Sequence, residues 1–366
     1  MNRSPLSRWL VLGLLVSGCR PGIAQSVPRV VDEFADRTGF NGVVLVARAD
    51  STLHAGAYGY EDAEARVPTR LDTRYQVGSV AKWVASLVAL RLADDGALSL
   101  SEPITTYLPD YREDVGGRVT LHHLLSNTSG VPNDLVAAYH ADPAVLNEPL
   151  TTSEAVGRFA SGDLAFEPGD RFDYSHSNWI LVQAVVERAS GRTFDGAVAD
   201  YVTSPLGLHH TGVFWDGSPD PGLAPGYEAL EPEPVRVDTP APRYLAATGG
   251  VYSTAPDLFA ILDALYDGPL LSDRTRRQLD AVTSEDPDLS VGAQAGGYAY
   301  GGRVRAMELG DHVERVLWHT GSNGPSKVRV SRVLSDGLTI ITLTNAGVDH
   351  EATGALVERV LGSLYR

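Results

Sequence analysis

Ser79 and Lys82 have the residue types and the spacing that nucleophilic catalysis requires. The stretch from Tyr75 to Ala93 predicts a buried helix, because nearly every residue from Val80 onward is Val, Ala, Leu or Trp. Lys82 falls in the first turn of this helix, three positions after Ser79, so both side chains are expected on one face. A serine hydroxyl beside an amine that can accept its proton is the beginning of an activated nucleophile.

Lys82 is an unfavourable residue for a purely structural helix. Lys327 is the only other lysine, and the remaining Lys and Arg positions are all arginine. A positive charge near a helix N-terminus opposes the helix dipole, and apolar surroundings add a desolvation cost. Both effects favour the neutral amine, so the sequence predicts a lowered pKa for Lys82. Ser79 by itself could instead be the N-cap of a helix beginning at Val80, and a lone S-x-x-K arises by chance, so catalysis needs further partners.

Two other segments could supply those partners. Tyr174 lies in F-D-Y-S-H-S-N-W, directly before a helix predicted over Ile180–Ala189, and it either points into a cleft or serves as a core aromatic. Asn178 is the expected N-cap of that helix. The other segment, H-T-G-S-N-G from His319, follows an apolar strand. Its glycine would let a substrate backbone approach the strand closely.

The elements that must position these residues fall into two groups. Strands are expected at both ends of the chain, and the segments between them are mostly helical and separated by loops rich in Pro and Gly. An antiparallel sheet built from both ends, with a helical insertion, is the simplest architecture. Helices are also expected at the beginning and the end of the domain, and the proline-rich stretch Gly217–Pro242 is expected to be an irregular surface excursion. The predicted strands are Asn41–Asp50, Thr52–Tyr60, Val313–Trp318, Val328–Leu334 and Leu338–Thr344. The predicted central helices are Leu121–Leu125, Thr152–Phe159, Trp179–Ala189 and Asp257–Tyr266.

The order of these motifs resembles that of serine β-lactamases and penicillin-binding proteins. The S-V-A-K segment at Ser79, the Tyr174 segment and the H-T-G segment at His319 follow one another as the three motifs of that superfamily do. More narrowly, the chain resembles the branch that contains class C β-lactamases, D-alanyl-D-alanine carboxypeptidases, D-aminopeptidases and related esterases. The segments V-T-L-H-H-L-L-S-N-T-S-G-V-P, E-P-G-D-R-F-D-Y-S and A-A-T-G-G-V-Y-S-T-A-P-D-L extend this similarity from about Val30 to the C-terminus.

The resemblance implies an α+β fold and a division of the chain. The fold would be a five-stranded antiparallel sheet flanked by N- and C-terminal helices, with a mostly α-helical domain and the active site between them. The hydrolase domain would span 28–366, with an α/β part over about 28–75 and 246–366 and a helical part over about 76–245.

The resemblance also implies a catalytic cycle through an acyl-enzyme. Ser79 would be the acylated nucleophile, and Lys82 and Tyr174 would act together as its base. A water molecule activated at Tyr174 would then release the acyl group. No cofactor is implied, and the substrate would be an amide or an ester, such as a D-amino-acid peptide, a β-lactam or a small ester.

The resemblance gives the third motif a substrate-binding role. His319 would replace the lysine often found on this strand and would help to bind or polarise the substrate near Tyr174. Thr320 and Gly321 would line the substrate, and the backbone N–H groups of Ser79 and Ser322 would form the oxyanion hole. The H-T-G form is typical of the carboxypeptidase and D-aminopeptidase relatives.

His176 departs from the pattern of the family. The second motif is usually Tyr-x-Asn, whereas this chain has Tyr174-Ser175-His176. In the family that asparagine contacts the amide on the acyl side of the substrate and the motif lysine. His176 could take over these contacts, add a titrating group or simply be tolerated, and Asn178 lies two residues too far along to replace the asparagine. The change argues most strongly against classical β-lactam turnover.

The first 24 residues predict an export signal. Arg3 and Arg8 precede a short apolar segment, Trp9–Val16, that is too short to span a bilayer. L-V-S-G-C resembles a lipobox, which would make Cys19, the only cysteine, the lipidated residue of a periplasmic or cell-surface lipoprotein. Such a lipoprotein would contact the membrane only through its lipid anchor. Cleavage after Ala24 would instead give a secreted protein.

Composition and motifs argue against several other classes of protein. A net charge of −16 argues against nucleic-acid binding. The ten histidines include tandem pairs but no H-E-x-x-H spacing, which argues against a catalytic metal. No G-x-S-x-G occurs, which argues against an α/β-hydrolase. The sequence therefore predicts a serine hydrolase whose partner is a small molecule or a peptide such as a peptidoglycan fragment; the alternative is a slow or inactive penicillin-binding protein that senses cell-wall ligands.

Overall fold

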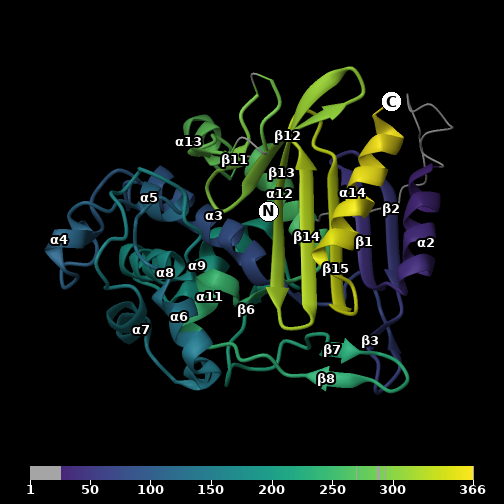
Figure 1. Cartoon of the computed structure of the whole chain (residues 1–366), viewed down its shortest axis with the longest axis horizontal. Coiled ribbons are helices and arrows are strands. Elements are labelled where there is room, and N and C mark those ends of the chain that lie inside the picture. The colour runs from purple at the N-terminus through teal and green to yellow at the C-terminus, as the bar shows by residue number, and fades with distance from the viewer. Residues whose placement is uncertain (1–25, 269, 287–288, 293, 366) are drawn as a thin grey trace, which may run out of the picture.

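A large antiparallel sheet built from both ends of the chain forms the centre of the computed structural model, which describes residues 26–268, 270–286, 289–292 and 294–365. Its main path runs β10-β11-β12-β13-β14-β15-β1-β2, so the N-terminal hairpin pairs with the last strand of the chain (Figure 1). The strand bounds are β1 (Asn41–Arg48), β2 (Ser51–Tyr58), β10 (Ser284–Glu285), β11 (Gly297–Tyr298), β12 (Arg303–Leu309), β13 (His312–Asn323), β14 (Ser326–Val333) and β15 (Thr339–Ala346).

The expected fold class is confirmed, but the sheet has more strands than the five that were expected. Within the described residues it has ten strands, since β7 (Gly226–Ala229) and β8 (Val235–Val237) join it beside β15. The stretch 217–242 is therefore not wholly irregular, and that prediction was wrong for these two strands. Strands of two to four residues, such as β7, β8, β10 and β11, are too short to carry a recognisable hydrophobic alternation.

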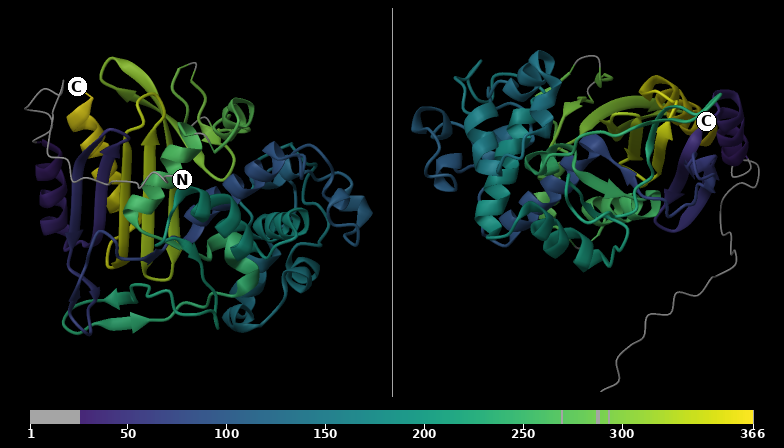
Figure 2. Two further views of the ribbon diagram at one scale, coloured as in Figure 1. Left: turned by 180° about the vertical axis from the view of Figure 1, so that it is seen from behind. Right: turned by 90° about the horizontal axis from the view of Figure 1, so that it is seen from below.

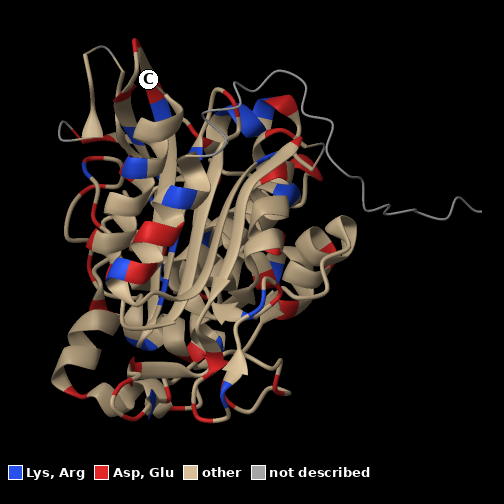
Figure 3. Cartoon of the chain, turned by 90° about the vertical axis from the view of Figure 1, so that its right-hand side faces the viewer, with Lys and Arg blue, Asp and Glu red and all other residues tan. Residues whose placement is uncertain are grey.

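Helices cover both faces of the sheet. On one face α14 (His350–Leu364) packs on β14 and α2 (Ser26–Thr38) packs on β2, whereas α12 (Ala255–Tyr266) packs on β1 and β15 (Figures 1 and 2). The central strands β1 and β15 are buried along almost their whole length, as their continuous apolar and β-branched sequences require. Figure 3 shows acidic and basic residues interspersed over the helices on the α14 side.

The helical part lies beside the sheet (Figure 2). Its central helix α3 (Ala81–Asp94) is buried over eleven of its residues, and α8 packs against it. The remaining helices are α4 (Glu113–Gly116), α5 (Leu121–Leu125), α6 (Asp134–Ala141), α7 (Thr152–Phe159), α8 (His176–Ser190), α9 (Phe194–Val198), α10 (Ser204–Leu206), α11 (Ala246–Gly249) and α13 (Asp273–Leu279); shorter turns are η1 (Gly78–Val80), η2 (Ile104–Thr106), η3 (Pro143–Asn147), η4 (Ala199–Thr203) and η5 (Arg243–Leu245); short strands are β3 (Tyr60–Asp62), β4 (Val67–Pro68), β5 (Tyr75–Gln76), β6 (Gly212–Val213) and β9 (Val251–Ser253).

Two helix starts differ from the sequence-based prediction. Asn178 was expected to cap α8, but the helix begins at His176 and the hydroxyl of Ser175 accepts the Asn178 N–H at 3.4 Å. Ser79 was the alternative cap of a helix beginning at Val80, but it lies inside η1, and α3 begins at Ala81 without a side-chain cap. Because the Ser79 hydroxyl does not cap a helix, it is available to Lys82.

The predicted export signal lies outside the described residues. Cys19 and the alternative cleavage position after Ala24 both fall within 1–25, so lipidation and export remain predictions. Among the helices that the structure describes, none combines the length and the apolar character needed to cross a bilayer.

Candidate active site

Ser79 and Lys82 lie together where η1 and α3 meet the sheet. The Lys82 Nζ donates to Ser79 Oγ at 3.1 Å and to the carbonyl oxygen of Thr248 at 2.7 Å. Lys82 has no exposed surface. The predicted pairing of a serine hydroxyl with a buried amine is therefore present in the structure.

The surroundings of Lys82 favour its neutral form. Its Nζ lies 5.2 Å from the centre of the Tyr174 ring and 5.7 Å from that of Trp179. Burial lowers the pKa of Lys82, and the electrostatic interaction with Tyr174 opposes this effect only in part. The lowered pKa that the sequence predicted is confirmed, and an amine in this state can accept a proton from a neighbouring hydroxyl.

Two glycines bring η1 and strand β13 into direct contact. A Cβ atom at Gly321 would collide with the carbonyl oxygen of Val77 and would lie 3.2 Å from the Ser79 nitrogen. Gly78 has a φ of +51°, and a Cβ atom there would collide with the backbone nitrogen of Ser322. The backbone nitrogens of Ser79 and Ser322 are thereby held close to one another, which is the arrangement that an oxyanion hole needs.

His319 lies on β13 and packs against the other aromatic residues of the site. Its ring centre is 6.3 Å from that of Tyr174 and 5.9 Å from that of Trp83. Its Nδ1 lies 2.5 Å from the carbonyl oxygen of Thr320, and within the described residues its buried Nε2 has no partner. Burial and the nearby Lys82 lower the pKa of His319 to about 3, so the imidazole is neutral at ordinary pH.

His176, the residue that departs from the family pattern, also enters the site. It is the first residue of α8, and its ring meets that of Tyr174 edge-on with centres 5.5 Å apart. Burial, followed by the charge of Lys82, lowers the pKa of His176 to about 3. This direction argues against a titrating role near neutral pH and favours contact with the substrate or simple tolerance, the other two alternatives for His176.

A cavity of about 370 Å³ opens beside Ser79, between β13 and the helical part. His176, Thr248 and Ser322 line it together with Leu135 and Val136 of α6. Its lining residues are Ser79, Leu135, Val136, Tyr139, His140, Leu146, His176, Thr239, Pro240, Ala241, Pro242, Leu245, Thr248, Gly249, Gly250, Ser322, Asn323 and Gly324.

The sequence did not indicate that the carbonyl of Thr248 accepts a hydrogen bond from Lys82, and it did not identify the walls of the cavity. The carbonyl of Thr248 holds Lys82 Nζ, and the neighbouring carbonyl of Gly249 accepts Asn323 Nδ2 at 2.9 Å, which ties α11 to β13. The A-A-T-G-G segment resembles the family, but a backbone carbonyl leaves no residue-type signal. The segments 137–150 and 217–242 contribute lining residues, and Tyr298, which is not among them, packs against Tyr174.

Comparison with known proteins agrees with this site. An antiparallel sheet, a helical part and a serine–lysine pair at their junction are features of a serine hydrolase, and residues 27–361 match the family described as Beta-lactamase. Esterase EstB from Burkholderia gladioli is 30% identical over 374 residues, which cover 89% of this chain and 91% of that relative. The chain therefore belongs to the beta-lactamase family and is a serine hydrolase of amide or ester substrates.

Solved structures share the same fold. The octameric penicillin-binding protein homologue from Pyrococcus abyssi matches with a TM-score of 0.75 at 24% identity, covering 91% of this chain and 76% of that chain. The D-amino acid amidase from Ochrobactrum anthropi SV3, in complex with L-phenylalanine, matches with a TM-score of 0.74 at 21% identity, covering 94% and 98%.

Proposed function

We propose that the protein hydrolyses carboxylic esters through an acyl-enzyme formed on Ser79. The observation that supports this most directly is the 3.1 Å contact between Ser79 Oγ and the buried amine of Lys82, whose pKa is lowered. Among the described residues Lys82 has no carboxylate partner, so its proton is not fixed by a permanent ion pair. Such an amine is suited to exchange protons during a reaction.

In the proposed acylation step, Ser79 Oγ attacks the ester carbonyl carbon while its proton passes to the Lys82–Tyr174 pair. The carbonyl oxygen becomes an oxyanion that accepts hydrogen bonds from the backbone N–H groups of Ser79 and Ser322. The pair then returns the proton to the alkoxy oxygen, and the alcohol leaves as the carbon–oxygen bond breaks. A water molecule deprotonated by the same pair attacks the acyl-enzyme, which releases the carboxylic acid and regenerates Ser79.

The remaining site residues are assigned to positioning. His319 is neutral and packs against Tyr174, so it orients the phenol without adding a charge. Thr320 and Gly321 continue the same strand and would line the substrate, with Gly321 allowing β13 to meet η1. His176 borders both Tyr174 and the cavity, where it is placed to contact the acyl group.

The character of the cavity favours esters over amides of D-amino acids. No Asp, Glu, Lys or Arg is among its lining residues in the described chain. An amino-acid amide carries an ammonium group on its acyl side, and that charge would be buried here without a carboxylate. Together with the esterase relative that matches along most of both chains, this outweighs the similarity of the H-T-G motif to peptidases.

The test is intact-protein mass spectrometry after exposure to a fluorophosphonate and to a labelled penicillin, followed by turnover of p-nitrophenyl esters, nitrocefin and D-alanyl peptides. Ester turnover and a fluorophosphonate adduct that is lost in Ser79→Ala are expected. An enzyme that forms a penicillin adduct on Ser79 but turns over none of these substrates would instead be a penicillin-binding protein. Turnover of esters that survives Ser79→Ala would refute the assignment of the nucleophile.

A further inference from the structure

The position of the cavity beside Ser79 suits the acyl group of the substrate. The oxyanion must point at the Ser79 and Ser322 nitrogens, and the leaving oxygen must lie near Tyr174, from which it takes a proton. Ser79 and Ser322 both line the cavity, whereas Tyr174 and Lys82 do not. The substituent that points away from the leaving group, which is the acyl group, therefore enters this space.

One wall of the cavity is a preformed apolar surface. Leu135 and Val136 come from α6, Leu146 from η3 and Leu245 from η5. Leu135 belongs to a small hydrophobic core that also contains Phe159, Ile180 and Tyr244, and Leu146 and Leu245 pack against this core. Because the wall is backed by packed side chains, it is expected to keep its shape when the cavity is empty.

The rest of the lining holds no Asp, Glu, Lys or Arg among the described residues. Pro240, Ala241 and Pro242 supply further apolar surface, and Asn323 is engaged with the Gly249 carbonyl. His176 has its pKa lowered to about 3 and is therefore neutral at ordinary pH. A cavity lined in this way offers no ionic partner to a charged acyl group of either sign.

The size of the cavity exceeds what a small acyl group needs. An apolar cavity of roughly 150 Å³ is enough to hold a benzene ring, and this cavity has about 370 Å³. Tyr139 stands at the rim with 41% of its surface exposed, one of the few large hydrophobic residues in the described chain that is so exposed. A longer acyl group could fill the cavity and cover this ring.

We propose that this cavity selects esters whose acyl part is uncharged and apolar, either a straight chain of about six to ten carbon atoms or an aryl-substituted chain. The proposal rests on the proposed ester hydrolysis at Ser79. Each methylene buried contributes roughly 0.8 kcal/mol, which corresponds to at most about a fourfold gain in kcat/KM per carbon until the cavity is full.

The experiment compares p-nitrophenyl esters from acetyl to dodecanoyl, together with phenylacetyl, on the wild type and two variants. Val136→Trp fills the cavity from α6, and Ala137→Trp places the same side chain one residue along, at an exposed position that does not line it. The ratio of kcat/KM for octanoyl to that for acetyl should exceed about tenfold in the wild type. It should fall at least tenfold in Val136→Trp and stay within about twofold in Ala137→Trp.

A binding measurement on Ser79→Ala separates failure of the cavity from failure of the chemistry. Phenylacetamide should bind, its affinity should fall in the Ser79→Ala, Val136→Trp double variant, and D-phenylalaninamide, which carries a positive charge, should bind at least tenfold more weakly. A flat chain-length profile, or tighter binding of the charged amide, would overturn the cavity proposal. If no ester is turned over and no Ser79 adduct forms, the proposed function fails, and the binding results alone then decide whether the cavity takes neutral apolar groups.

Discussion

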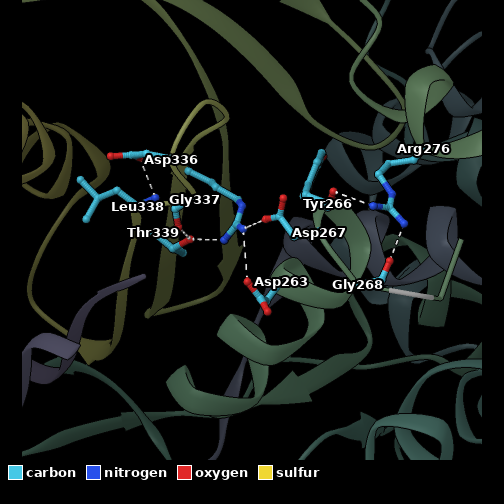
Figure 4. A network of polar contacts seen from close by, with 10 residues as sticks. Asp263, Tyr266, Asp267, Gly268, Arg276, Asp336, Gly337, Leu338 and Thr339 are labelled. Atoms are coloured by element: carbon cyan, nitrogen blue, oxygen red, sulfur yellow. Dashed lines mark hydrogen bonds and ion pairs between the residues drawn. The ribbon is translucent and has the colours of Figure 1, made fainter. Parts of the chain in front are cut away.

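Two basic side chains, Arg332 and Lys82, are buried in the part of the chain that the structure describes, and their surroundings differ completely. Arg332 on β14 has 1% of its side chain exposed and donates to Thr339 Oγ1 at 2.7 Å, to Asp263 at 3.3 Å and also to Asp267 (Figure 4). Lys82 on α3 is fully buried but is bonded only to a hydroxyl and a carbonyl oxygen within the described residues. One cation has its charge balanced, whereas the other does not.

The difference separates a structural cation from a chemical one. Arg332 joins the β14–β15 hairpin to α12 through two carboxylates, so its positive charge is favourable where it lies. Lys82 lies among aromatic rings, so burial favours loss of its proton. A buried amine that must lose its proton on folding costs stability, and its position beside a serine hydroxyl supports the proposed role of Lys82 as a base.

The largest expected effect is the loss of acylation in Lys82→Met. Methionine has a similar length and no proton to exchange, so fluorophosphonate labelling and kcat/KM for a p-nitrophenyl ester should fall by at least about 10³-fold. The matched control is Lys327→Met, which removes the other lysine, whose Nζ donates to the Gly324 carbonyl at the surface. Acylation of Lys82→Met within about tenfold of the wild type would contradict the role of the amine.

The same substitution should stabilise the protein. Folding costs free energy wherever the unfolded lysine must lose its proton, so an apolar side chain in its place is expected to raise the free energy of unfolding. A lysine whose folded pKa is lowered binds fewer protons in the folded state, so wild-type stability rises with pH between that pKa and the unfolded value near 10.4. Urea titrations at several pH values should show this slope in the wild type and its loss in Lys82→Met.

Arg332→Met should have the opposite effects: lower stability and unchanged activity. Removing the guanidinium breaks three charge-assisted or buried hydrogen bonds, so the free energy of unfolding should fall by about 2–4 kcal/mol. Asp263 and Asp267 keep 32% and 59% of their side chains exposed, so neither is left fully buried without a partner. The kcat/KM of the folded protein should stay within about twofold, which denaturant titration and ester kinetics on one preparation can check.

The control for Arg332 is a surface pair. Arg359 bonds to Glu33 at 3.0 Å with 34% and 54% of the two side chains exposed, and Arg359→Met should cost less than about 1 kcal/mol. If Arg332→Met lost activity while it stayed folded, Arg332 would not have the purely structural role that its two carboxylate partners indicate.

The site could be predicted from the sequence where a rare residue type marks a position. A lysine among apolar residues at Lys82, followed far along the chain by Tyr174 and His319, was sufficient to predict a cluster that the fold brings together. The hairpin and the three C-terminal strands were equally clear because their apolar runs are long and are bounded by turn residues. Residues that act through their backbone, such as Thr248, left no comparable signal.

The cap of α8 and the walls of the cavity could not be predicted, because they depend on contacts that form only in the folded chain. Ser175 and Asn178 are both good helix caps, and they lie three positions apart. Asn178 accepts the Ser129 hydroxyl at 2.6 Å and donates to Asn127 at 3.3 Å, so long-range bonds occupy it and Ser175 becomes the cap. The cavity walls are ordinary apolar residues of α6, η3 and η5, whose types do not distinguish a lining residue from a core residue.

The smallest effect concerns the two histidines that lie near Lys82. In the proposed mechanism the free amine is the base, so kcat/KM should rise with pH through the lowered pKa of Lys82 and then level off. His176 and His319 both have pKa values of about 3, so neither can produce that rise above about pH 5. His176→Gln should therefore change the height of the pH profile by less than about tenfold and move its midpoint by less than about 0.3 units. A midpoint that moves by a full unit would mean that His176 titrates in the working enzyme, and the unbalanced charge beside Ser79 would then be shared between Lys82 and an imidazole.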